Sequence, residues 1–455
     1  MKIWLCHLAI TLLLCTSSAF AQSQRNLVEE GRRIFFEEDF DGNGRTCGTC
    51  HPAEHNFTID AEFIATLDDN DPLFVHENDP ENLGDLEDSF LLREFGLILE
   101  NVDGPDSHVF RGVPHNVGMS VSINADPAHL GPTRHAVGWS GDGAPGDGTI
   151  ADFLEGAIRQ HFPQTLDRIE GDDFRLPEPD EVAAVEAFLR SLGRQEELDI
   201  EAMQFADQNV DAGRRLFLGD DGVNRGCNGC HGNAGANNSA GFNRNFDTGT
   251  RTLSQDPGLF GANTLPPDGG FGTEAHGDGG FGDGTFNVPS LVEAADTPPF
   301  FHNNSAETIE DAVAHYTTST FGNSPAGGGP EEPDPFQLTR EQINQVAAFL
   351  RAINAQENVR TGNVLSAQAQ RLRGDEATDR IREVIAESED AIEVLEGAAT
   401  GRFQPAVPQL RAALGHERRA LSSRNDAQRN RSLQQAQDMK TRAIEALLSR
   451  RVASR

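Results

Sequence analysis

Apolar residues at helical spacing occur in two segments of similar sequence, 28–35 (VEEGRRIF) and 210–217 (VDAGRRLF). A second similar pair, 185–190 (VEAFLR) and 346–351 (VAAFLR), follows them in the same order. This spacing predicts helices with one buried face. Because both pairs keep their order, the chain is predicted to be an internal duplication, with copies of about 150–180 residues.

The pattern changes after residue 358, where Ala, Arg, Glu and Gln become frequent. A helical stripe of apolar residues and two later helix starts, after Pro408 and Asp426, predict a small helical bundle or a docking element. The stripe consists of Ile381, Val384, Ile385, Ile392 and Leu395. By contrast, the Gly- and Asn-rich stretch 233–284 predicts a loop.

The first residues have the pattern of a secretory signal. Lys2 is followed by a mostly apolar run through Leu14 and by the small-x-small site Ala19-Phe20-Ala21. The apolar run is too short to span a bilayer, and no later segment is long enough. We therefore expect residues 1–21 to be removed as a signal peptide and the protein to have no membrane span.

Two pentapeptides point to the chemistry, CGTCH at 47–51 and CNGCH at 227–231. The two thiols of each can add to the vinyl groups of one porphyrin, and the following histidine can then bind the iron. A redox dithiol would need only the cysteines, and a zinc site would need a second pair of ligands nearby. The sequence thus predicts two covalently bound haem c groups, attached through Cys47, Cys50, Cys227 and Cys230, with His51 and His231 as iron ligands.

Cys6 and Cys15 lie within the expected signal peptide, so all other cysteines are haem thiols and no disulfide is expected. Haem attachment outside the cytoplasm, together with a bacterial-type signal, indicates the periplasm. The predicted fold class is mainly α. It consists of two cytochrome c-like haem domains from the duplication, at 22–204 and 205–357, followed by a helical extension at 358–455 whose sequence indicates no chemistry.

The charge is uneven along the chain. The formal net charge is −35, yet the residues from Gly401 onward hold twelve Lys and Arg against four Asp and Glu, which leaves about −43 on residues 1–400. An acidic body of this kind repels nucleic acid and attracts basic partners, or simply keeps a secreted protein soluble.

Methionine usage limits the ligands of the second iron. After the signal, only Met119, Met203 and Met439 remain, so the second haem domain has no Met. Electron-transfer cytochromes usually close the far face of the iron with Met or His, whereas haems that handle oxygen or peroxide leave it open. The candidates in the second domain are His276, His302, His315 and Tyr316.

Over roughly residues 27–357 the chain resembles the bacterial di-haem cytochrome c peroxidase/MauG family. The resemblance rests on the two haem motifs and their spacing, on VPSL at 288–291, on TPPFFH at 297–302 and on the helix that carries Tyr316. It implies that Tyr316 is the second axial ligand of the C-terminal haem, a position that is Met in the peroxidases and Tyr in the MauG-like branch. It also implies that Trp139 lies between the haems as a stepping stone for electrons, the alternative being a packed core residue.

The resemblance further implies that the first haem reacts with hydrogen peroxide on an open face opposite His51. Peroxide cleavage needs a group that takes a proton and returns it to the leaving oxygen. The family uses a Glu and a Gln after the Trp turn, but here Gly156 stands where the Gln is expected. His161 is the substitute we favour, unless it is only a surface or packing residue. Further candidates, as acid–base groups or as iron ligands, are His108, His115, His129 and His135.

The family also binds a calcium ion between the domains, partly through backbone oxygens that correspond here to Thr297 and Pro299. The Asn that supplies its side-chain ligand corresponds to Gly112, so this sequence lacks one part of the expected calcium site.

The predicted function is a periplasmic di-haem c oxidoreductase in which peroxide reacts at the first haem and electrons pass through the second. The reductant would be a small redox protein (cytochrome c or cupredoxin) docking on the acidic body, or an oxidisable side chain of a protein substrate. One alternative is a di-haem oxygenase acting on an organic substrate. Another is an electron-transfer cytochrome without turnover, with both irons six-coordinate.

Overall fold

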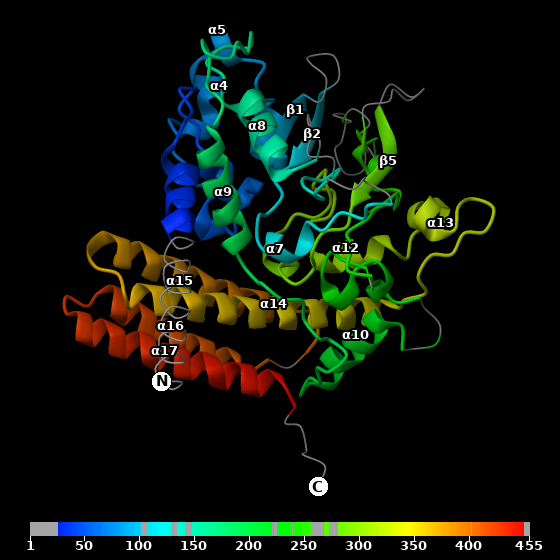
Figure 1. The fold of residues 1–455 in the computed structure, drawn as a ribbon. Helices are drawn as coiled ribbons and strands as arrows, with labels where there is room; N and C mark the ends of the chain where they lie inside the picture. Colours follow the sequence, from blue (N-terminus) through cyan, green and yellow to red (C-terminus); the bar gives the residue numbers. More distant parts are fainter. Residues whose placement is uncertain are drawn as a thin grey trace, which may run out of the picture.

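The computed structural model describes residues 26–101, 108–128, 134–141, 148–220, 222, 225–238, 240–255, 265, 268–272, 281–401 and 403–449. The expected signal peptide at 1–21 lies outside these residues. Within them the chain is mainly helical, with two small sheets, which confirms the expected fold class at this coarse level (Figure 1). Among the described residues, no helix combines the length and the apolar character needed to cross a membrane.

The first half consists of short helices around one hairpin. Its helices cover 26–37, α2 (Cys47–Cys50), α3 (Ala61–Ile64), α4 (Val75–Asn78), α5 (Pro80–Leu83), α6 (Ser89–Phe95), α7 (Met119–Ser122), α8 (Ile150–His161) and α9 (Pro179–Ser191), with single 3-10 turns at Ala53–His55 and Pro72–Phe74. The hairpin pairs β1 (Leu97–Asn101) with β2 (His108–Gly112) in antiparallel register, Leu97 opposite Gly112.

The second half and the extension follow in sequence. The second half contains α10 (Gln208–Leu218), α12 (Ile309–His315), α13 (Ser319–Asn323), the start of α14 (Arg340–Ala369), strands β3 (Asn245–Phe246), β4 (Asp268–Gly270) and β5 (Phe281–Asn287), and 3-10 turns at Cys227–Gly229, Gly232–Ala234, Thr250–Gln255, Ala294–Asp296 and Pro325–Gly327. The extension continues with α15 (Gly374–Glu396), α16 (Val407–Leu421) and α17 (Asp426–Leu447). The helices expected from the apolar stripe and after Pro408 and Asp426 are thus confirmed.

Part of the Gly-rich stretch forms a sheet, where the sequence pattern predicted only loop. The strand order is β3-β5-β4, with β3 antiparallel and β4 parallel to β5. Burial alternates along β5, since Gly282, Gly284 and Phe286 are buried and Asp283 is exposed. This alternation of buried and exposed residues is typical of a strand. The pattern of apolar residues did not predict it, because two of the buried positions are glycines.

The helices that carry the candidate site residues begin at well-formed caps. The Thr149 hydroxyl accepts the backbone N–H of Asp152 at the start of α8, and the Thr308 hydroxyl accepts that of Asp311 at the start of α12. Such caps satisfy backbone donors that the helix itself leaves free. These caps fix where α8 and α12 begin. The C-terminal end of each helix lies near the site.

The two halves contain the same kind of helix crossing. A Cβ on Gly31 would lie 1.9 Å from the Ala184 carbonyl oxygen in α9, and a Cβ on Gly213 would lie 1.8 Å from the Gln345 carbonyl oxygen in α14. Only glycine allows backbones to approach this closely. In the sequence pattern, Gly31 corresponds to Gly213 and Ala184 to Gln345, so corresponding residues make corresponding contacts.

The extension shares its core with the second half. Helix α14 continues without a break across position 357/358, and one apolar cluster joins residues such as Phe349 in α14 with Leu395 in α15 and Leu410 in α16. The first half has a separate core, which includes Phe35 and Phe188. Figure 1 shows α14 to α17 side by side, below α9 of the first half, with α10 of the second half against α14.

Two contacts connect the extension to the first half. The Arg32 guanidinium lies 2.6 Å from the Glu383 carboxylate of α15. The Asn56 side-chain amide donates to Asp390 of α15 and to the Asp296 carbonyl of the second half, both at 3.2 Å. Asn56 therefore links all three parts of the chain.

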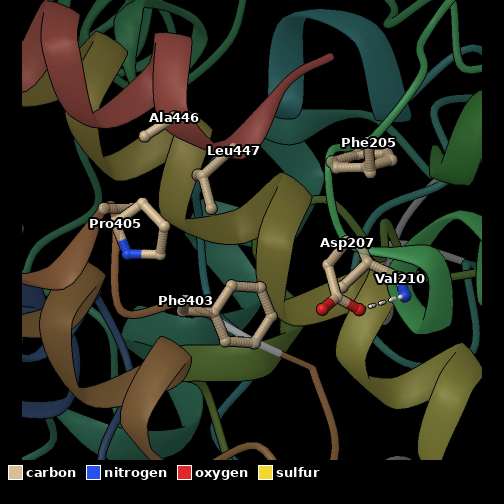
Figure 2. Close-up of a pocket in the computed structure, with 8 residues that line it drawn as sticks. Phe205, Asp207, Val210, Phe403, Pro405, Ala446 and Leu447 are labelled. Atoms are coloured by element: carbon tan, nitrogen blue, oxygen red, sulfur yellow. Dashed lines mark hydrogen bonds between the residues drawn. The ribbon is translucent and has the colours of Figure 1, made fainter.

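A small pocket marks the junction between α10 and the extension. Figure 2 shows Phe403 and Pro405 facing Phe205, with Leu447 above them and the Asp207 carboxylate bonded to the Val210 N–H at the start of α10. Its volume of about 10 Å³ suits at most one water molecule. We therefore regard it as a packing defect, not as a ligand site.

A buried ion pair within the extension gives a stability prediction. Lys440 of α17 and Glu417 of α16 are both fully buried, with the ammonium 2.7 Å from the carboxylate, although neither forms a well-aligned hydrogen bond. Lys440→Met leaves the carboxylate unpaired and should destabilise the fold by about 3–5 kcal/mol. Urea unfolding followed by circular dichroism measures this change.

The exposed Arg442→Met in the same helix is the matched control and should shift stability by no more than about 0.5 kcal/mol. The pair Lys440→Met with Glu417→Leu should recover most of the loss, because it removes both buried charges. A loss in Lys440→Met no larger than in the control would show that the pair contributes nothing.

Candidate haem-binding site

A single cavity of about 540 Å³ connects the two cysteine motifs. Its lining includes Cys47, Cys50 and His51 at the end that we call the first haem site, and Cys227, Cys230 and His231 at the end that we call the second. Much of the remaining lining is apolar, for example Phe35, Ile123 and Leu350. Protein interiors are otherwise close-packed, so a cavity of this size and character indicates the place of large apolar groups.

At the first haem site, the motif places a neutral imidazole in the cavity. Helix α2 turns Cys47 and Cys50 into the cavity as free thiols, and burial raises their pKa to about 12 and about 11. Nδ1 of His51 lies 2.7 Å from the Phe57 carbonyl oxygen. Burial, with smaller contributions from nearby His161 and His115, lowers the pKa of His51 to about 4. A neutral imidazole that donates from Nδ1 keeps Nε2 available for a metal.

The second haem site repeats this arrangement. Nδ1 of His231 lies 3.1 Å from the Pro289 carbonyl oxygen, and burial lowers the pKa of His231 to about 4. Burial also raises the pKa of Cys227 to about 12. Both sites therefore offer two unpaired thiols and one oriented imidazole at an apolar cavity, and this donor set fits a covalently attached haem.

Tyr316 lies at the second haem site, directly after the last residue of α12. Its side chain lines the cavity, and its hydroxyl has no hydrogen-bond partner among the described residues. Burial, together with the neighbouring Cys227 and Cys230, raises the pKa of this hydroxyl well above its ordinary value. A nearby cation would stabilise the phenolate here, and ferric iron of a bound haem would be such a cation.

The histidine alternatives to Tyr316 have different positions. His315 does not line the cavity, and its Nε2 lies 2.9 Å from the Thr248 carbonyl oxygen. His302 does line the cavity, where it stacks on Phe286 with ring centres 3.9 Å apart and Nε2 3.8 Å from Asp268. His276 lies outside the described residues. Of the two histidines that the structure describes, His302 competes with Tyr316 on position and His315 does not.

Trp139 lies at the seam between the two halves and lines the cavity. Its indole N–H donates to the Gly112 carbonyl at 2.7 Å, and the Gly112 N–H donates to the His302 carbonyl at 2.8 Å. The Trp139 carbonyl accepts the N–H of Asn287 in β5. Hydrogen bonds therefore run from the indole into the second half of the chain.

His161, the last residue of α8, lines the cavity near His51. Its Nδ1 lies 3.7 Å from Oε1 of Glu87, a fully buried carboxylate, and Nη1 of the buried Arg45 lies 2.9 Å from the same oxygen. Burial alone would raise the pKa of Glu87, but His161 and Arg45 together lower it to about 2.

The other histidines of the first half differ in role. Nδ1 of His135 accepts the Ile150 N–H at the start of α8, so this imidazole acts as a helix cap. His115 lines the cavity, its Nδ1 is buried without a hydrogen-bond partner, and burial followed by the nearby Arg194 lowers its pKa to about 4. His129 and the side chain of His108 lie outside what the structure describes.

The expected calcium ligands, Thr297 and Pro299, lie in the second half of the chain. Thr297 and Pro299 line the cavity, and the Thr297 hydroxyl bonds to the Glu293 carbonyl. At Gly112 a Cβ would lie 2.1 Å from the side-chain oxygen of Asn304, so a larger residue there would displace the Asn304 side chain. Among the described residues, no cluster of three or more His, Cys, Asp or Glu could hold a metal ion. A calcium site at the backbone oxygens of Thr297 and Pro299 stays a prediction.

The sequence pattern did not identify Glu87 and Arg45. Glu87 stands in a mostly acidic stretch, 85–88 (DLED), and resembles a solvated carboxylate. Its fully buried state depends on Arg45, 42 positions earlier, which no local pattern indicates. Arg45 does stand two positions before Cys47, and this was the available signal.

Comparison with known proteins gives a partial match. No family model matches the chain. A segment of 74 residues, 16% of this chain, is 32% identical to a protein of Denitromonas iodatirespirans named cytochrome-c peroxidase IdrP1. The segment is thus similar to a cytochrome-c peroxidase. The match spans about a fifth of that protein's length (19%), so it suggests peroxidase-type haem c chemistry only in general terms.

Proposed function

We propose that the protein is a di-haem c oxidoreductase that reduces hydrogen peroxide at the first haem site and receives electrons through the second. The overall reaction consumes peroxide, two protons and two electrons and yields two water molecules. A c-type haem held by Cys47, Cys50 and His51 would supply the iron for cleavage of the O–O bond. The protein supplies the attachment, the proton transfer and the route for electrons.

The observation that carries this proposal is the difference between the two ends of one cavity. Both ends offer two thiols and an imidazole whose Nδ1 faces a carbonyl oxygen. The second end also has Tyr316, a hydroxyl without a partner, whereas the first has His161 beside a buried carboxylate. A ligand at one end and an acid–base group at the other suit one electron-transfer haem and one reactive haem.

Each residue then has a defined task. Cys47, Cys50, Cys227 and Cys230 attach the two haems. His51 and His231 bind iron through Nε2, and Tyr316 closes the second haem site. Trp139, which is hydrogen-bonded where the two halves of the chain meet, provides an oxidisable ring between the two haem sites. The matching glycine contacts of the two halves support a duplication of one haem domain, at 22–204 and 205–357.

Peroxide consumption tests this function. The parent protein should carry two haem additions by mass spectrometry and should oxidise a reduced c-type cytochrome when peroxide is added. Changing both Cys47 and Cys50 to Ala should remove one haem and abolish turnover. Changing Cys227 and Cys230 should remove the other haem and stop electron delivery, while peroxide still alters the remaining spectrum. A parent protein with fewer than two haems would contradict the proposal.

Tyr316→Phe tests the ligand of the second haem. A phenolate is a hard anionic donor that favours ferric iron, so its removal should raise the reduction potential of that haem and change its low-spin signal. Potentiometric titration and electron paramagnetic resonance measure both. His302→Gln is the matched control, because His302 lines the same cavity. If only the control changes the spectrum, His302 is the ligand.

One observation favours a second candidate function. His115 lines the cavity close to His51 and has a buried nitrogen without a partner, so it could bind the first iron on its open face. Both irons would then be six-coordinate, as in an electron-transfer cytochrome. The spin state of the ferric protein separates this candidate from the peroxidase.

A further inference from the structure

Glu87 is held as an anion in the interior of the first half. Its Oε1 accepts from Nη1 of Arg45 at 2.9 Å, and its Oε2 accepts from the Leu99 N–H at 2.7 Å. Arg45 in turn donates through Nη2 to the Leu73 carbonyl oxygen at 2.7 Å. A buried carboxylate is costly unless it is paired and hydrogen-bonded, and here both conditions are met.

His161 also lies close to Glu87, although the pair with Arg45 does not require it. Nδ1 of His161 lies 3.7 Å from Oε1, and this imidazole helps to keep the pKa of the Glu87 carboxyl low. The distance exceeds that of a hydrogen bond, but acid–base contacts are often long before the substrate binds. The imidazole also lines the cavity, so it lies between the carboxylate and the space of the first haem site.

Both groups are anchored to the loop that leads into the CGTCH motif. The Asn43 side-chain amide donates to the carbonyl oxygens of His161 and Pro163, both at 3.0 Å, and thereby holds the end of α8. Arg45, two positions later, holds Glu87. The loop at 43–46 therefore fixes His161 and Glu87 relative to Cys47, the first haem thiol.

A carboxylate beside Nδ1 determines what an imidazole can do. It keeps the proton on Nδ1, orients the ring and stabilises the charged form after Nε2 has taken a proton. Nε2 then takes a proton from one oxygen of peroxide and returns it to the other, which leaves as water. The electrons for this cleavage come from the reductant of the proposed reaction.

We propose that Glu87 is the positioning residue of His161, and that Arg45 keeps it ionised for this role. The inference rests on the proposed function, because it assigns the acid–base pair of the peroxide-reacting site. Glu87 touches neither substrate nor haem and acts only through the imidazole.

Cyanide binding to the ferric protein tests this role without turnover. Hydrogen cyanide is a neutral acid that binds iron as its anion, so fast association requires a base that removes its proton. In Glu87→Gln, with both haems retained, stopped-flow association should slow by roughly tenfold or more. Glu94→Gln, an exposed change in α6, is the matched control and should leave the rate unchanged.

A double-mutant cycle separates positioning from an independent effect. His161→Gln should slow cyanide association at least as much as Glu87→Gln. The double variant should be no slower than His161→Gln alone, because Glu87 acts through that imidazole. If the two losses multiply, or if Glu87→Gln binds cyanide at the parent rate, the inference is wrong.

Two further measurements complete the test. Should Glu87→Gln not fold, Glu87→Asp is the second variant, because it keeps the charge beside Arg45 and draws it away from His161. It should also slow cyanide association. Cyanide association at the rate of the parent protein would contradict the proposal. Should the parent protein bind neither cyanide nor peroxide, the proposed function fails, and the role of Glu87 fails with it. The parent protein alone reveals that outcome, so it can be distinguished from a failure of the Glu87 variants.

Discussion

Peroxide reduction by His161→Gln should be slower than that of the parent protein by about 10²–10⁴-fold, the usual contribution of a positioned acid–base group. The loss should fall on the reaction with peroxide, because His161 lies near His51 at the first haem site. Stopped-flow absorbance of the ferric protein after mixing with peroxide gives the rate directly.

The matched control is His55→Gln, which makes the same change near the first motif but outside the cavity lining. It should retain the parent rate. If His161→Gln and the parent protein react with peroxide at equal rates, another residue must be the acid–base group. His115 is then the first residue to examine, because it lines the same cavity.

Replacing Trp139 by Phe should slow electron transfer between the two haem sites, while both sites keep their haem. Phe fills most of the volume of the indole, so the loss of stability should be modest, about 1–2 kcal/mol. Phe is much harder to oxidise than Trp, and it cannot donate to the Gly112 carbonyl as Trp139 does at 2.7 Å. Transfer between the sites should therefore slow sharply.

In Trp139→Phe, peroxide should still change the spectrum of the first haem site at the parent rate, while oxidation at the second lags or fails. Phe153→Leu is a suitable control, since Phe153 lines the same cavity. Unchanged transfer in a folded Trp139→Phe protein would show that the indole only packs the seam, and another route would have to be sought.

The sequence predicted those parts of the molecule that depend on local pattern. The apolar stripe from Ile381 to Leu395 became one face of α15, and the starts near Pro408 and Asp426 became α16 and α17. The two motifs predict haem attachment from sequence alone, because five adjacent residues carry that chemistry.

Other parts depend on contacts that no local pattern contains. Helix α14 buries nearly every side chain from Val346 to Ala355, so it has no apolar stripe from which to judge its length, and it runs past position 358. Glu87 is oriented by Arg45 and Leu99, residues 42 positions before it and 12 after it. Sequence alone could not distinguish this buried carboxylate from the acidic surface residues beside it.

The central claim is that the two haem sites differ, with Tyr316 closing the second and the first left open to peroxide. Electron paramagnetic resonance of the ferric protein, before and after a slight excess of peroxide, tests this most directly. The account predicts one high-spin and one low-spin signal, with rapid loss of the high-spin signal after mixing. Two low-spin signals that peroxide leaves unchanged would contradict it and would identify an electron carrier instead.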